Sequence, residues 1–110
     1  MVKELDMNNF LSEVGDAKFA VVDFWAEWCQ PCRQMSPLLS EIEGEIGSKF
    51  SFFKVNVDKA SDIASQYGIQ SIPTLLIFKK GKPITSMIGL LPKSLIKKEL
   101  ENTIRGPSVL

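Results

Sequence analysis

The chain has 110 residues, of which 45% are hydrophobic and 24% are charged. This length and composition predict one globular domain with a substantial core and argue against a disordered chain. The 13 Lys and Arg residues balance the 13 Asp and Glu residues. The basic surplus of a nucleic-acid-binding protein is therefore absent, and we expect no nucleic-acid partner.

The sequence also indicates where in the cell the protein is expected. It contains no run of about 18 apolar residues, the length needed for a membrane-spanning helix, so no membrane partner is expected. The N-terminal residues, MVKELDMNNF, lack the apolar run of a signal peptide. We therefore expect a cytoplasmic protein, in which a purely structural disulfide would be unusual. Residues 1–110 should form a single domain, with a folded core at 1–105 and a short tail at 106–110.

Short strand-like segments alternate along the chain with segments of helical period. Residues 2–5 predict a short first strand. Apolar residues at helical spacing then predict the buried face of a helix: Met7, Phe10, Leu11 and Val14. This helix should begin near Asp6 or Asn8 and end at Gly15.

The middle of the chain contains two further strands and two further helices. Residues 19–25, FAVVDFW, are almost continuously apolar, as in a strand covered on both faces. Residues 51–57, SFFKVNV, predict another strand. Apolar stripes mark a long helix after the cysteines and a shorter helix that ends at Gly68. The two stripes are Met35, Leu38, Leu39, Ile42 and Ile46, and Ala60, Ile63, Ala64 and Tyr67.

The C-terminal third predicts a hairpin and a final helix. Residues 74–80 and 83–89 flank a turn at Gly81 and should pair as antiparallel strands. Pro92 suits the first turn of the last helix, whose core stripe is Ile96, Leu100 and Ile104. Helices that alternate with buried strands, followed by a hairpin and a closing helix, indicate an α/β fold. We expect a central mixed sheet with helices on both faces.

The only two cysteines, Cys29 and Cys32, have the spacing C-x-x-C. A zinc site needs three or four ligands; with two cysteines and no histidine, no metal site is expected. A structural disulfide around so small a loop would contribute about 2 kcal/mol, which a domain with this core hardly needs. A pair that cycles between dithiol and disulfide is therefore the favoured interpretation.

The position of the cysteine pair supports this redox interpretation. It lies where a buried strand passes into a helix, so Cys29 should lie near the helix N-terminus. Free backbone N–H groups and the positive end of the helix dipole stabilise a thiolate at such a place, and the thiolate is the reactive nucleophile. Pro31 fits the first helical turn. C-x-x-C between a strand and a helix is a strong indicator of thiol–disulfide chemistry.

Several separated motifs resemble the thioredoxin family, in its order and spacing: VVDFWAEWCQPCRQMSP, KVNVD, IQSIPTLLIFKKGK and IGL. The resemblance covers essentially the whole chain and implies the thioredoxin fold and the reduction of protein disulfides. It implies no cofactor besides the redox-active Cys29–Cys32 disulfide, with reducing equivalents from a thioredoxin reductase. Disulfide-containing proteins such as reductases and peroxiredoxins would be the acceptors, and we expect a monomer.

The resemblance also implies catalytic roles. Cys29 matches the attacking cysteine of the family and Cys32 the resolving one. Asp23 interrupts an apolar strand, and a buried, unpaired carboxyl has a raised pKa, as a base that works near neutral pH requires. Asp23 matches the buried acid of the family, the expected base for Cys32; a strand-end carboxylate that points to water is the alternative. Lys54 matches the lysine beside that acid, and would otherwise be an ordinary surface lysine.

The expected substrate site surrounds Pro73. From the sequence alone an Ile–Pro bond is expected to be trans, but the family resemblance implies a cis proline that faces the cysteines. An extended partner segment could then pair with the backbone beside Pro73. The other expected substrate-binding residues are Trp28, Gln30, Pro31, Ile72, Gly89 and Leu90. Without the resemblance, the apolar residues of this set could equally be core and turn residues.

Two positions differ from the family pattern. Arg33 stands where Lys is usual and keeps the charge. Gln30 stands where Gly is usual, between the cysteines, where residues tune thiolate stability and hence the direction of electron transfer. An oxidant or isomerase is therefore one alternative, and a binding module that uses the groove without turnover is another. A glutathione-dependent glutaredoxin is a third, although Trp-Cys-x-Pro-Cys and the Ile72–Pro73 pair resemble thioredoxin more closely.

Overall fold

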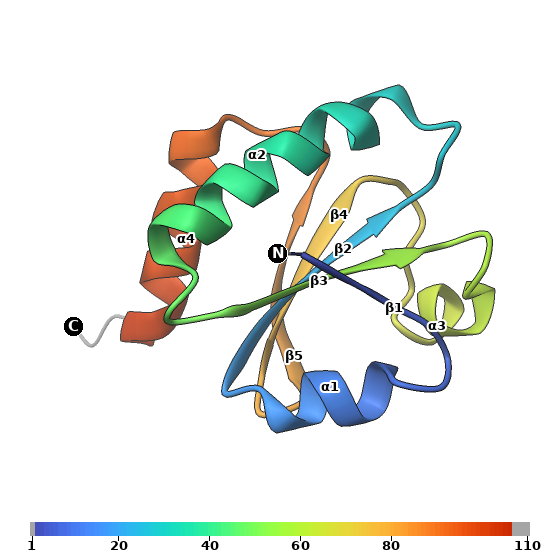
Figure 1. Ribbon diagram of the computed structural model, residues 1–110, viewed down its shortest axis with the longest axis horizontal. Coiled ribbons are helices and arrows are strands. Elements are labelled where there is room, and N and C mark those ends of the chain that lie inside the picture. The colour runs from blue at the N-terminus through green and yellow to red at the C-terminus, as the bar shows by residue number, and fades with distance from the viewer. Residues whose placement is uncertain (1, 107–110) are drawn as a thin grey trace.

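The computed structural model describes residues 2–106, which form a sheet between two helical layers (Figure 1). The strands are β1 (Lys3–Leu5), β2 (Phe19–Trp25), β3 (Ser51–Asn56), β4 (Thr74–Lys79) and β5 (Lys82–Ile88). The helices are α1 (Phe10–Asp16), α2 (Gln30–Ile46), α3 (Ser61–Gln66) and α4 (Lys93–Arg105). Of the predicted tail, 107–110 lie outside the described residues. Within 2–106, no helix is long and apolar enough to cross a membrane.

The sheet is mixed, as predicted, with the strand order β1-β3-β2-β4-β5. β1, β3 and β2 run parallel to one another, and β4 and β5 continue the sheet in antiparallel pairs. The continuously apolar β2 lies at its centre, where both faces are covered. Asp23 therefore lies in the middle of the sheet, in register with Lys54 on β3 and with Leu75 on β4.

The helices divide into two layers, α2 and α4 on one face of the sheet and α1 and α3 on the other (Figure 1). Successive side chains of a strand point to opposite faces. Val21 thus packs toward α2 and α4, whereas Val22 packs toward α1 and α3. Asp23 has the same parity as Val21 and faces the α2 layer.

The predicted buried face of the first helix is wrong at two of its four positions. Phe10 and Val14 are buried, but Met7 is 56% exposed and Leu11 is 73% exposed. α1 begins only at Phe10, so Met7 lies in the turn before it. A helix of seven residues covers the sheet with a narrow stripe, and the i, i+4 pair of Phe10 and Val14 fills that stripe.

The turn before α1 explains why the helix starts later than predicted. The Asp6 carboxylate accepts hydrogen bonds from the backbone N–H groups of Asn8, at 2.8 Å, and Asn9, at 3.3 Å. The Asn9 side chain in turn accepts one from the Asp6 N–H group at 2.8 Å. These local bonds compete with helical bonds and delay the helix until after Asn9.

The predicted turn at Gly81 is confirmed. Lys80 and Gly81 have φ angles of 50° and 82°. Two successive residues with positive φ form the tight turn that suits the twist of an antiparallel hairpin. Gly81 adopts this conformation without strain, and β4 and β5 pair on either side of it.

Leu39→Ala should lower the free energy of unfolding by about 2–5 kcal/mol, because Leu39 lies fully inside the α2 layer of the core. Leu11→Ala should change it by no more than about 0.5 kcal/mol, because the Leu11 side chain lies in solvent. Urea unfolding of both oxidised variants would test this. A loss at Leu11 as large as that at Leu39 would contradict the exposed position of Leu11.

Candidate active site

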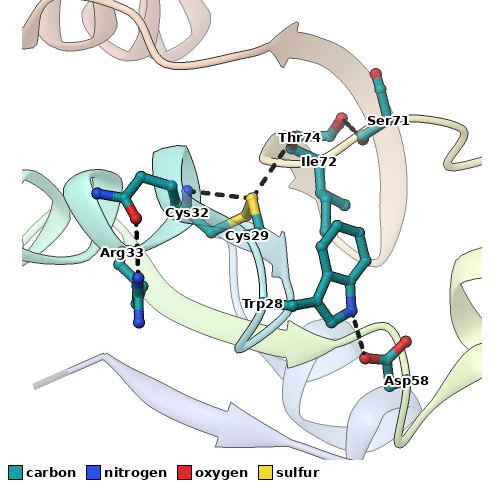
Figure 2. The surroundings of a disulfide bond; sticks show 9 residues. Trp28, Cys29, Cys32, Arg33, Asp58, Ser71, Ile72 and Thr74 are labelled. Carbon is teal, nitrogen blue, oxygen red and sulfur yellow. Dashed lines mark hydrogen bonds between the residues drawn. A yellow bond between two sulfur atoms is a disulfide. The ribbon is translucent and has the colours of Figure 1, made fainter.

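Cys29 and Cys32 form a disulfide at the start of α2, with their Cα atoms 5.2 Å apart (Figure 2). Cys29 is the N-cap residue, and Gln30 and Pro31 are the first two helical residues, as predicted for Pro31. The backbone N–H group of Cys32 donates a hydrogen bond to Cys29 Sγ at 3.2 Å. This N–H group would otherwise have no partner within the helix, and it can stabilise negative charge on Cys29 Sγ in the reduced protein.

The predicted cis proline is confirmed and lies beside the disulfide. The Ile72–Pro73 peptide bond is cis, and the Ile72 carbonyl oxygen lies 3.8 Å from Cys29 Sγ (Figure 2). The Pro73 carbonyl accepts a hydrogen bond from the Gly89 N–H group at 2.8 Å. Gly89 and the following Leu90 are therefore held next to the proline, although they lie after β5.

Trp28 extends over an open pocket next to the disulfide. Its side chain is 71% exposed, and its indole N–H group donates a hydrogen bond to Asp58 Oδ2 at 2.8 Å (Figure 2). The pocket has a volume of about 340 Å³ and is lined by Trp28, Val57, Ile69, Gln70, Ser71 and Ile72. Asp58 was not predicted as a site residue from the sequence, although it is the last residue of the KVNVD motif.

Gln30 contacts Arg33, the other residue that departs from the family pattern. Gln30 Oε1 accepts a hydrogen bond from Arg33 Nη2 at 2.9 Å, and both side chains are exposed. Within residues 2–106, Gln30 makes no side-chain hydrogen bond to either sulfur. In the oxidised protein its amide oxygen therefore interacts with a neighbouring cation, and the side chain does not hydrogen-bond to the disulfide.

Asp23 is buried, as its apolar strand predicts, and the alternative of a carboxylate in water is wrong. It is 3% exposed, and its Oδ1 has no hydrogen-bond partner among residues 2–106. Burial raises the pKa of Asp23 to about 7; the charge of Lys54 opposes this rise and that of Glu4 adds to it. The carboxyl borders a cavity of about 260 Å³ lined by Asp23, Trp25, Cys32, Arg33, Ser36, Pro37 and Lys54.

Lys54 lies in register with Asp23, as the resemblance implies, but its ion pair is with another residue. Lys54 Nζ lies 4.0 Å from Glu4 Oε1 and 5.1 Å from the centre of the Trp25 ring. Glu4 was not predicted as a site residue from the sequence, because only the pairing of β1 with β3 brings it to Lys54. No group of three or more potential metal ligands occurs among residues 2–106.

Thiol–disulfide exchange needs one sulfur that a partner thiol or disulfide can reach and a second thiol close enough to displace that partner. Both cysteines are largely buried, with Cys29 5% exposed and Cys32 2% exposed. Cys29 Sγ lies 3.8 Å from the carbonyl oxygen of Ile72, a residue that lines the pocket beside Trp28, whereas Cys32 lines the cavity of Asp23. The two sulfurs are bonded to each other, and of the two cysteines it is Cys32 that lines the cavity of Asp23. Fold and site together define a thiol–disulfide oxidoreductase.

Comparison with known proteins gives the family. The family model described as Thioredoxin matches residues 1–102. Thioredoxin 2 of Chlorobaculum tepidum is 46% identical over 97 residues, which cover 87% of this chain and 89% of the relative. Thioredoxin 1 of Nostoc sp. is 45% identical over 95 residues, covering 86% and 89%. The chain belongs to the thioredoxin family, whose members are protein-disulfide reductases.

A solved structure agrees with this assignment. A mutant thioredoxin from Halobacterium salinarum superposes with a TM-score of 0.84 at 25% sequence identity. The match covers 90% of this chain and 87% of that chain. The thioredoxin fold and the thiol–disulfide oxidoreductase function inferred from the sequence motifs are confirmed.

The raised pKa of Asp23 predicts a pH-dependent cost to stability. In the folded protein Asp23 keeps its proton up to about pH 7, whereas the ordinary pKa of an aspartate is 3.8. Between these values the folded state binds the extra proton, so the free energy of unfolding falls as the pH rises. Asp23→Asn cannot ionise and should escape this loss. We expect it to be more stable than the unaltered protein by up to about 4 kcal/mol above pH 7, and by much less near pH 4.

Urea unfolding of the oxidised protein between pH 4 and pH 9 would measure this difference. Asp16→Asn is the matched control, because the Asp16 side chain is exposed at the end of α1. The difference in the free energy of unfolding between Asp16→Asn and the unaltered protein should stay nearly constant between pH 4 and pH 9. If the stability difference between Asp23→Asn and the unaltered protein did not change with pH, the raised pKa would be wrong.

Proposed function

We propose that this thioredoxin-family protein reduces partner disulfides in two exchange steps, with Cys29 as the attacking and Cys32 as the resolving cysteine. The Cys29 thiolate attacks one sulfur of the partner, which forms a mixed disulfide and releases the other partner sulfur as a thiolate. The Cys32 thiolate then attacks Cys29 Sγ, which restores the Cys29–Cys32 disulfide and releases the second partner thiol. The partner gains two electrons, which a reductase later returns to the protein.

The different surroundings of the two sulfurs carry this assignment. Cys29 Sγ has the Cys32 N–H group at 3.2 Å, and it lies 3.8 Å from the carbonyl oxygen of Ile72, which lines the pocket beside Trp28. Cys32 lines the cavity of about 260 Å³ that the Asp23 carboxyl also borders. A nucleophile needs thiolate stabilisation and access to a partner, whereas a resolving thiol needs a base.

We assign that base role to Asp23. A carboxyl with a pKa of about 7 is partly ionised at neutral pH, and it can take the proton of the Cys32 thiol and pass it on to solvent. Asp23, Cys32 and Lys54 border the same cavity of about 260 Å³. The charge of Lys54 moderates the pKa of Asp23, which supports the proposed participation of Lys54.

Partner binding is assigned to the surface around the disulfide. The Ile72 carbonyl lies 3.8 Å from Cys29 Sγ, where an extended partner segment could pair with the backbone. Exposed Trp28 and Leu90 offer apolar contact beside it. The full proposed substrate-binding set is Trp28, Gln30, Pro31, Ile72, Pro73, Gly89 and Leu90.

The proposed physiological setting follows from the family. A thioredoxin reductase would supply the electrons, and disulfide-containing proteins such as reductases and peroxiredoxins would accept them. We propose a monomer that acts in the cytoplasm, without a cofactor beyond the Cys29–Cys32 pair. In this setting the cysteine pair would be kept reduced and would act as a donor of electrons.

The Cys32→Ser variant should accumulate a mixed disulfide with partner proteins, because Cys29 can attack but nothing displaces the partner. The Cys29→Ser variant should form none, because Cys32 lies away from the partner surface. Non-reducing electrophoresis after incubation with a disulfide-containing protein would measure both, with the double variant as control. Equal adduct formation by both single variants would contradict the assigned roles.

The reduction potential tests the direction of electron transfer. The known potential of thioredoxin is about −270 mV, whereas disulfide isomerases and strong oxidants lie at about −180 to −120 mV. Among residues 2–106 the Gln30 side chain donates no hydrogen bond to either sulfur, and we expect a value near the low end. Gln30→Gly should shift it by less than about 30 mV, a tenfold change in the exchange equilibrium.

Equilibration of both forms with a thiol buffer of known potential gives these values. The alternative result is a reduction potential near −180 mV in the unaltered protein and a lower one in Gln30→Gly. It would mean that Gln30 raises the potential of the cysteine pair. The donor role would then give way to that of an oxidant or isomerase.

A further inference from the structure

Three charged side chains lie in one row across the sheet. Glu4 on β1 is in register with Lys54 on β3, and Lys54 is in register with Asp23 on β2. Because the three strands are parallel neighbours, residues in register project from the same face. Two carboxyl groups thus flank one ammonium group, one of them in the core and the other at the edge of the sheet.

The carboxylate of Glu4 is held in place by two donors. Its Oε2 accepts a hydrogen bond from the Asn56 backbone N–H group at 3.1 Å and another from the Trp25 indole N–H group at 3.4 Å. Its Oε1 lies 4.0 Å from Lys54 Nζ. An exposed glutamate that receives donors from β2 and β3 is fixed more firmly than an ordinary surface side chain.

Lys54 is drawn toward this fixed carboxylate and away from the core. Its ammonium group lies 4.0 Å from Glu4 and 5.1 Å from the centre of the Trp25 ring, which attracts cations. In the part of the chain that the structure describes, Lys54 forms no ion pair with Asp23 within 4.0 Å, and Asp23 Oδ1 has no hydrogen-bond partner. The buried carboxyl lacks the close cation that its register neighbour could supply.

We infer that Glu4 is a positioning residue for the resolving step: it holds the Lys54 ammonium group at the edge of the sheet and so leaves the Asp23 carboxyl without a close cation. Without Glu4, Lys54 would turn toward Asp23 and stabilise its ionised form. Asp23 would then be a weaker base for the Cys32 proton. The inference rests on the proposed base role of Asp23.

The charges around Asp23 agree with this arrangement. Lys54 faces it from β3, Glu4 from β1, and Arg33 of α2 borders the same cavity, whereas its β4 neighbour Leu75 is uncharged. The charge of Lys54 lowers the pKa of Asp23, and that of Glu4 raises it. The side chains of Lys54 and Glu4 are 33% and 44% exposed, so water screens them and each moves the pKa only modestly.

Titration of the Asp23 carboxyl carbon by NMR in the oxidised protein would test the inference directly. Glu4→Gln removes the charge but keeps an oxygen that can accept from Asn56 and Trp25. The Asp23 titration midpoint should fall by roughly half a pH unit. Glu13→Gln is the matched control, because Glu13 is paired with exposed Lys3 at 3.0 Å, and it should leave the midpoint unchanged.

A second background tests whether Glu4 acts through Lys54. Lys54→Met alone should raise the Asp23 midpoint, because the opposing cation is lost. In the Lys54→Met background, Glu4→Gln should then shift the Asp23 titration midpoint. This shift should be less than half as large as the shift that Glu4→Gln causes when Lys54 is present. An equal shift in both backgrounds, or no downward shift in the single Glu4→Gln variant, would overturn the inference.

The kinetics of the resolving step separate this inference from the proposed role of Asp23. A chromophoric aromatic thiol is attached to Cys29 as a mixed disulfide, and its release by Cys32 is followed against pH. The midpoint of the rate profile should move in parallel with the Asp23 titration. If the carboxyl midpoint fell while the rate profile stayed fixed, the base role of Asp23 would fail, and the control of Lys54 by Glu4 would stand.

Discussion

Burial of the Asp23 carboxyl in β2 costs free energy, because water no longer solvates its charged form. The rest of the site is arranged around this cost. The central position of β2 buries Asp23, and the cavity beneath α2 connects it to Cys32. The pairing of β3 with β2 brings Lys54 near, and the pairing of β1 with β3 adds Glu4. The protein thus gives up some stability near neutral pH in return for a carboxyl that can hold a proton there.

Local patterns were enough to predict most of the fold and the centre of the site. The apolar run of β2, the glycine turn at Gly81 and the C-x-x-C pair before α2 each depend on neighbouring residues, and each is confirmed. The family motifs added the cis bond before Pro73, which the statistics of Ile–Pro bonds alone would not have predicted. Where sequence neighbours determine the structure, the sequence is informative.

The features that the sequence did not predict depend on contacts between distant segments. Leu11 has helical spacing but lies in solvent, because so short a helix touches the sheet along one narrow stripe. Glu4 reaches Lys54 only through strand pairing, and Asp58 reaches Trp28 from a loop 30 residues away in the chain. The pairing register of two strands and the path of a loop are tertiary properties, so periodicity along one segment does not reveal them.

Cys29 Sγ lies beside the carbonyl of Ile72, next to the pocket of Trp28, whereas Cys32 lines the cavity of Asp23 and Lys54. In the proposed mechanism, electrons and protons therefore take different routes. Electrons pass through Cys29 to the docked partner, whereas the proton leaves Cys32 through the cavity of Asp23. A partner seated over Trp28 does not have to leave before the proton does, so the chemistry can be completed while the complex is still closed.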